Sequence, residues 1–182
     1  MIIRRATVDD AGAIAAIHVH AWRVAYRNIL PSAFLETLSV EARERGWRRN
    51  LERRDAETWV ADGGGELVGW VNAGRSRDSD TLPTTAEVWA IYVAPPHWRQ
   101  GVGRCLWQEA EKQLSGAGFD AVNLWVLKQN AQAIAFYEAR GLAVESWVER
   151  TVTLGGAELV EIRLQKRLGG QSPNRADAPE YP

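Results

Sequence analysis

The sequence contains one cysteine and three histidines among 182 residues. A single cysteine excludes a disulfide within the chain and a cysteine-rich zinc site. His18 and His20 lie two positions apart in a helical pattern, so they would point about 200° apart at 3.6 residues per turn. That geometry argues against a shared metal ion, and we expect no metal site.

The chain also lacks an excess of charge and a long apolar run. Its 22 basic and 23 acidic residues give a formal net charge of −1. Nucleic-acid binding requires a clustered basic excess, and no apolar run approaches the ~18 residues of a membrane span. Residues 1–7 carry no apolar core of a signal peptide. We therefore expect a cytoplasmic protein with neither a nucleic-acid nor a membrane partner.

The length and composition are those of a globular chain. Hydrophobic residues make up 46 % and charged residues 25 %, which predicts one domain over residues 1–168. Residues 169–182 are rich in glycine, proline and polar residues, which predicts a flexible tail. The nine tryptophans outnumber the four tyrosines and three phenylalanines together. They either pack the core or wall a ligand pocket, since an indole combines a large apolar surface with an N–H donor.

The hydrophobic periodicity predicts an α/β (α+β) fold. We expect a mixed, mostly antiparallel central sheet with helices on both of its faces. The predicted strands are residues 2–6, 58–61, 66–73, 87–93, 121–127, 146–154 and 158–168. The predicted helices are residues 9–28, 32–54, 101–114 and 130–140, the last of which we expect Asn130 to cap.

The strongest local pattern lies in residues 87–104, where a strand enters a tight turn and Gly101 and Gly103 open an amphipathic helix. A helix N-terminus presents unpaired N–H groups and positive potential. The segment has no Gly-Lys-Ser/Thr of a Walker A loop, and Leu106 occupies the third glycine position of a dinucleotide fingerprint. The pattern therefore indicates an anion site, for a phosphate or a pyrophosphate.

A second segment, residues 124–142, makes this interpretation specific. Asn130, Ala133, Phe136, Tyr137 and Gly141 form the pattern Asn-x-x-Ala-x-x-Phe-Tyr-x-x-x-Gly about thirty residues after the glycine turn. The two segments together resemble the GNAT superfamily of N-acetyltransferases, which move an acyl group from acyl-coenzyme A to an amine. The resemblance extends over about residues 1–168.

Two positions depart from the family pattern. Leu142 stands where the family has a final phenylalanine, and Trp98 stands at a loop position that is usually arginine or glutamine. Because the family's loop binds mainly through backbone N–H groups, we expect phosphate binding to survive the second change.

The resemblance implies acetyl-CoA as the acyl donor. It implies that the backbone N–H groups of residues 100–104 surround the pyrophosphate and that the fourth and fifth strands splay apart to admit the pantetheine arm. The implied cofactor-binding residues are Ile91, Tyr92, Val93, Arg99, Gln100, Gly101, Val102, Gly103, Arg104, Asn130, Ala133, Phe136 and Tyr137.

The resemblance also implies catalytic roles. Glu87 would accept the proton of the amine, directly or through water; the alternative is an ordinary ion-paired strand residue. A backbone N–H of Tyr92 or Val93 would stabilise the oxyanion. Tyr137 would protonate the leaving thiolate, its alternative being a core aromatic residue.

The acceptor pocket is less specified. His18, Trp22 and Tyr26 share one helix face and could line it together with Trp89, or they could simply pack on the sheet. We expect direct transfer of an acetyl group to a primary amine of a small molecule or peptide, in a ternary complex. The alternative is a non-catalytic acyl-CoA-binding sensor on the same fold. The C-terminal hairpin and the many tryptophans favour a homodimer.

Overall fold

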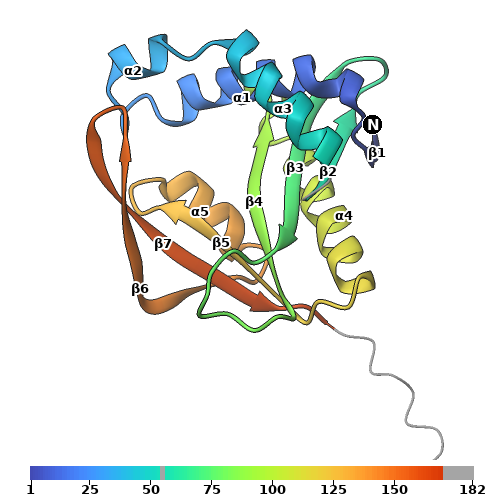
Figure 1. The fold of residues 1–182 in the computed structure, drawn as a ribbon, viewed down its shortest axis with the longest axis vertical. Helices are drawn as coiled ribbons and strands as arrows, with labels where there is room; N and C mark the ends of the chain where they lie inside the picture. The colour runs from blue at the N-terminus through green and yellow to red at the C-terminus, as the bar shows by residue number, and fades with distance from the viewer. Residues whose placement is uncertain (54–55, 170–182) are drawn as a thin grey trace, which may run out of the picture.

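A seven-stranded sheet forms the centre of the computed structural model, which describes residues 1–53 and 56–169 (Figure 1). The strands are β1 Ile2–Arg5, β2 Glu57–Asp62, β3 Leu67–Arg75, β4 Thr85–Val93, β5 Ala121–Leu127, β6 Ala143–Leu154 and β7 Ala157–Arg167. Their spatial order is β1-β2-β3-β4-β5-β7-β6. Only β4 and β5 are parallel; all other neighbours are antiparallel. The predicted mixed, mostly antiparallel sheet is confirmed.

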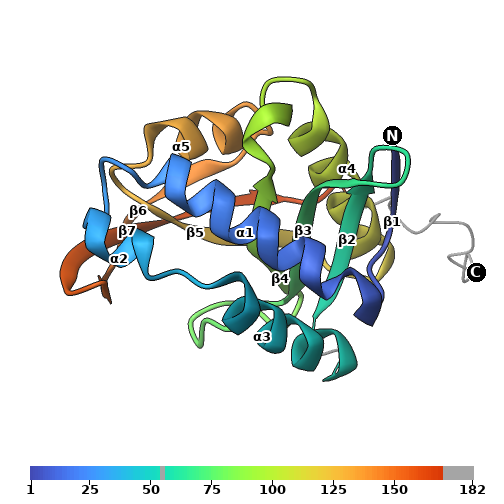
Figure 2. The ribbon, with the colours of Figure 1, turned by 90° about the horizontal axis from the view of Figure 1, so that it is seen from above.

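Helices cover both faces of this sheet (Figure 2). They are α1 Ala11–Ala25, α2 Ser32–Glu36, α3 Val40–Arg53, α4 Val102–Gly116 and α5 Ala131–Glu138, with 3-10 turns at Val8–Asp10 and Pro95–His97. α1 and α3 pack against each other over one face, and α4 packs on β2, β3 and β4 from the other. α5 shares the apolar core of α4.

Side chains of the central strands alternate between the two faces. Val60 and Trp70 pack with the α1–α3 layer, whereas their neighbours Ala61 and Val71 pack with the α4 layer. A strand with period-two side chains becomes buried on both sides when helices cover both faces. This explains why the central strands read as nearly continuous apolar runs.

β4 and β5 pair over only three residues each. Thr85–Glu87 of β4 align with Ala121–Asn123 of β5, and beyond these positions the described strands share no register. The two strands therefore diverge, as expected, and leave an opening in the middle of the sheet.

The single helix predicted over residues 32–54 is wrong. α2 and α3 are separate, because the Ser39 hydroxyl accepts a hydrogen bond from the Ala42 N–H at 3.1 Å and so starts a new helix. Arg23 of α1 donates to the carbonyls of Leu35 and Leu38 at the end of α2. A serine cap directly before the charged run was the available signal.

The C-terminal hairpin forms as predicted, with a longer β6. Its register with β7 shifts between Val144 and Glu149, and the Trp147 side chain inside this bulge is fully exposed. The homodimer stays a prediction. The predicted flexible tail lies outside the described residues, apart from Gly169. Within residues 1–53 and 56–169, no helix has the length and apolar character needed to cross a bilayer.

Candidate functional site

A cavity of about 890 Å³ occupies the opening between β4 and β5. Most of the residues proposed from the sequence line it: Trp22, Tyr26, Trp89, Ile91, Tyr92, Val93, Arg99, Gly101, Gly103, Arg104, Asn130, Ala133, Phe136 and Tyr137. Glu87, Gln100 and Val102 do not. The tertiary fold thus brings together residues of α1, β4, the turn before α4, and α5.

The turn before α4 is shaped by two residues in the left-handed region. Arg99 has φ +60° and Gly101 has φ +85°. An added Cβ at Gly101 would meet only Arg104 Nη2, at 3.9 Å, so glycine is favoured there for its backbone conformation rather than for space. The first helical bond runs from the Cys105 N–H to the Gly101 carbonyl. The N–H groups of residues 102–104 are thereby left without an acceptor in the helix.

Gly103 has a different reason to be glycine. An added Cβ would lie 3.1 Å from Cε2 of Phe136 in α5. The close approach of α4 and α5 therefore depends on the missing side chain. The sequence pattern joined Gly101 and Gly103 in one role, and the structure separates them into a turn residue and a packing residue.

The side chains of Gln100 and Val102 do not contribute to the cavity wall. Gln100 is exposed, and its side-chain amide donates to the Pro96 carbonyl at 2.8 Å. Val102 is buried in the core beside Leu106. Only their backbone N–H groups remain available for the predicted role. Trp98 donates from Nε1 to the Val93 carbonyl at 2.7 Å, which ties the loop to the end of β4.

α5 begins at Asn130, whose side-chain oxygen accepts the Ala133 N–H at 3.1 Å. The predicted helix cap is confirmed. Tyr137 lies two turns further along the helix, 9 % exposed, with its ring packed edge-on against Trp107 and Phe136. Burial raises the pKa of the Tyr137 phenol, and the neighbouring Tyr26 adds to this effect. Tyr137 therefore keeps its proton at neutral pH.

The open edge of β4 presents backbone N–H groups to the cavity. The Ala94 N–H donates to the Val68 carbonyl next to β3. Because successive N–H groups of a strand alternate between its two edges, the Tyr92 N–H also points to β3. The Val93 N–H then points to the side where β5 has diverged. Of the two sequence candidates, Val93 has the geometry of an oxyanion donor.

Glu87 has a different environment from the one expected. It is 1 % exposed, and its carboxylate accepts hydrogen bonds from the backbone N–H and the guanidinium of Arg77. It does not line the cavity, so the expected direct contact with an acceptor amine is corrected. The observed partner indicates that Glu87 anchors the loop between β3 and β4.

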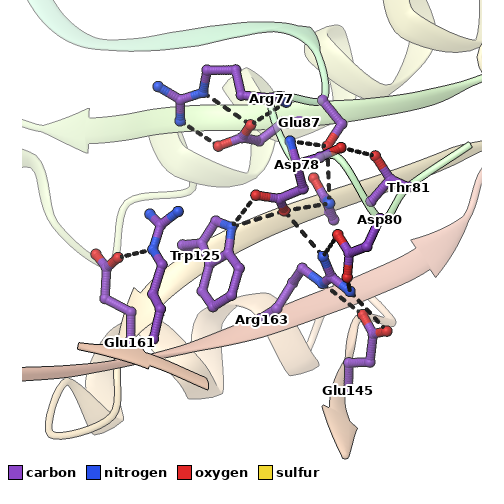
Figure 3. A network of polar contacts seen from close by, with 12 residues as sticks. Arg77, Asp78, Asp80, Thr81, Glu87, Trp125, Glu145, Glu161 and Arg163 are labelled. Atoms are coloured by element: carbon purple, nitrogen blue, oxygen red, sulfur yellow. Dashed lines mark hydrogen bonds and ion pairs between the residues drawn. The ribbon is translucent and has the colours of Figure 1, made fainter. Parts of the chain in front are cut away.

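That loop carries a polar network that the sequence did not reveal (Figure 3). Arg163 of β7 is buried and pairs with Asp78 and Asp80 of the loop and with Glu145. Asp78 also accepts the indole N–H of Trp125, at 2.9 Å to Oδ2. The network therefore fixes the orientation of a tryptophan that lines the cavity.

A second group of aromatic residues lies around α1 and β4. The Tyr26 and Tyr92 hydroxyls are hydrogen-bonded at 3.1 Å. The His18 ring stacks on Tyr92 with centroids 5.2 Å apart, and its Nδ1 accepts the Trp47 indole N–H at 3.4 Å. Burial lowers the pKa of His18 to about 3, with a further contribution from the positive charge of Arg43. His18 is therefore neutral at physiological pH.

The sequence prediction missed several cavity residues, among them Trp125 on β5, Arg140 after α5 and Glu161 on β7. Period-two alternation places Glu161 and Arg163 on the same face of β7 as the buried Leu159. Two charged residues on the same strand face as a buried leucine were the available signal for a polar group in the cavity. The same pattern is equally typical of a strand face exposed to solvent.

The fold of this chain is the fold of N-acetyltransferases. The PaiA N-acetyltransferase of Thermoplasma acidophilum, solved in complex with coenzyme A, has a TM-score of 0.70 at 21 % identity, over 91 % of this chain and 98 % of that chain. The protein yncA of Salmonella typhimurium, solved with its cofactor acetyl-CoA, has a TM-score of 0.69 at 22 % identity, over 99 % and 98 % of the two chains.

Sequence comparison specifies the family. The model of the acetyltransferase (GNAT) family matches residues 18–142. An uncharacterized N-acetyltransferase of Bacillus subtilis, YuaI, is 32 % identical over 164 residues, which is 89 % of this chain and 90 % of the relative. The chain therefore belongs to the GNAT family of acetyltransferases, and the resemblance noted in the sequence is confirmed.

Proposed function

We propose that this protein transfers an acetyl group from acetyl-CoA to a primary amine, directly within a ternary complex. The observation that carries the proposal is the cavity between β4 and β5, which connects the N-terminus of α4 to an aromatic chamber beside α1. The coenzyme A and acetyl-CoA complexes of the two structural relatives agree with it.

The residues around the α4 N-terminus fit a pyrophosphate. Three helix N–H groups without intrahelical partners, the left-handed turn at Gly101, and the cavity-lining Arg99 and Arg104 supply donors and positive charge. Asn130 and Ala133 line the route toward Tyr137. An anionic donor molecule would be held here by backbone dipoles as well as by charge.

At the centre, this chain's own groups match the needs of acyl transfer. The neutral amine nitrogen forms a bond to the thioester carbonyl carbon, and the carbon–sulfur bond breaks. The Val93 N–H stabilises the negative charge that develops on the carbonyl oxygen. Tyr137, which its raised pKa keeps protonated, donates its proton to the leaving sulfur and regains one from solvent. The amine loses its own proton to water.

The decisive experiment is a screen of amines read by release of free thiol from acetyl-CoA, with mass spectrometry of the acetylated product. Transfer to at least one amine supports the proposal. Tight binding of acetyl-CoA without transfer to any amine in a broad panel would instead support the acyl-CoA sensor.

The same assay tests Glu87. If it accepted the amine proton through water, Glu87→Gln would lower turnover mainly at neutral pH, and higher pH would narrow the gap to the wild type. The ion pair with Arg77 leads us to expect the opposite: a pH–rate profile of unchanged shape and a lower melting temperature. If Glu87→Gln kept its melting temperature but shifted the pH–rate profile, Glu87 would be the group that accepts the amine proton.

A further inference from the structure

The charged residues that line the cavity are separated by sign. Arg99 and Arg104 flank the start of α4, and Arg140 lies near Arg104. Burial lowers the pKa of Arg140, and the positive charge of Arg104 lowers it further. Within residues 1–53 and 56–169, the one carboxylate in the cavity wall belongs to Glu161. The cavity therefore has a basic part and an acidic part.

These two parts lie on opposite faces of the sheet. Arg104 belongs to α4. Glu161 lies on the same face of β7 as Leu159, which packs against Leu30 and Leu35 on the side of α1 and α2. The next residue, Ile162, packs with the α4 layer instead. A ligand that spans the cavity would thus meet arginines on one side of the sheet and a carboxylate on the other.

Aromatic rings surround the acidic part. Trp22 and Tyr26 of α1, Trp89 of β4 and Trp125 of β5 all line the cavity. They provide a wide apolar surface for the body of a ligand, and aromatic faces attract organic cations.

Glu161 is held in place with part of its carboxylate unused. Its side chain is 17 % exposed, and Oε2 accepts the Arg150 Nε at 2.7 Å (Figure 3). The described residues provide no hydrogen-bond donor to Oε1. Arg150 itself stacks over the Trp125 ring at 4.1 Å and does not line the cavity. A carboxylate at an apolar wall interacts more strongly with a ligand charge than one in water does.

We propose that Glu161 binds the positive charge of the acceptor, so that the acceptor is a cationic primary amine on an apolar body, without a carboxylate beside the amine. This inference rests on the proposed function. An amine at neutral pH arrives as an ammonium ion, which Oε1 of Glu161 attracts. The bound ammonium releases one proton to water before its neutral nitrogen attacks the thioester. The carboxylate of an amino acid would instead be repelled at the same position.

The test uses a probe that cannot be acetylated, so that it does not depend on transfer. Binding of N,N,N-trimethyl-2-phenylethylammonium to the coenzyme A-loaded protein is measured by calorimetry for the wild type, Glu161→Gln and Glu149→Gln. Glu149 is the matched control, because it lies on the same hairpin and also forms an ion pair, with Lys128 after β5, but is outside the cavity wall. We expect about tenfold weaker binding for Glu161→Gln and unchanged binding for the control.

A second measurement needs no variant. 3-Phenylpropionate, an anion of similar size, should bind the wild type at least about tenfold more weakly than the cation, and added salt should weaken only the cation. Equal affinity of the cation for wild type and Glu161→Gln, or tighter binding of the anion, would overturn the inference. Because the probe is inert, such a result differs from a failure of the proposed function, which would appear as the absence of transfer.

Discussion

The donor side and the acceptor side of the cavity are built in different ways. The donor side comes from two short continuous segments, residues 97–104 and 130–140. Its geometry is set by the N-termini of two helices and by the glycines at the start of α4. The acceptor side combines side chains from α1, β4, β5 and β7, and a buried polar network around Arg163 holds one of them, Trp125, in place. The donor side therefore has a local sequence pattern, whereas the acceptor side exists only after the sheet has formed.

The largest effect is expected at Tyr137, where the two sides meet. Tyr137→Phe keeps the ring and its packing but removes the proton donor, so the rate of transfer should fall by about 10²–10⁴, or roughly 3–5 kcal/mol. Acetyl-CoA affinity, measured by calorimetry, should change little. A joint loss of affinity and stability would show instead that Tyr137 is a packing residue.

The acceptor side should depend on Arg163. Arg163→Met would leave Asp78 and Glu145 without their buried cation and should lower the free energy of unfolding by about 3 kcal/mol. Lys128→Met, which removes the exposed ion pair between Lys128 and Glu149 of β6, should cost less than about 1 kcal/mol. Denaturant unfolding measures both. Equal costs would mean that the network does not organise this side.

The acceptor side should also be sensitive to acid through His18. Its folded-state pKa, about 3, lies below the ordinary value, so its stabilising contribution is complete above pH ~6.5 and is lost as the pH falls toward 3. Between pH 7 and pH 5 the free energy of unfolding should drop by about 2 kcal/mol from this group. His18→Gln should flatten the dependence, and His20→Gln, at an exposed position, should not. An identical pH dependence in wild type and His18→Gln would contradict the buried neutral state.

The smallest effect belongs to the donor side. Gly101→Ala places a Cβ on a left-handed residue, which costs roughly 1–2 kcal/mol. If the turn relaxes to avoid this cost, acetyl-CoA affinity should fall about five- to thirtyfold. Gly116→Ala, at the end of the same helix with nothing within 4 Å of the added Cβ, is the control. If both variants bound acetyl-CoA as tightly as the wild type, the conformation of the turn at Gly101 would not contribute to phosphate binding.

The sequence alone determined the sheet class, most element positions and the donor side. Strand periodicity and helix caps are local, and the two motifs specify a turn, a helix start and a cap at Asn130 that all appear in the structure. Local patterns failed within residues 32–54, where a serine cap before the charged run separates α2 from α3.

Only the tertiary structure decided the acceptor side. The sequence could not show that Glu87 meets Arg77 rather than the cavity, nor that Glu161 of β7 reaches the gap left by β4 and β5. Both outcomes depend on which strands become neighbours and which faces the helices cover. These are long-range choices, because a strand residue alternates between two faces and its partners lie tens of residues away.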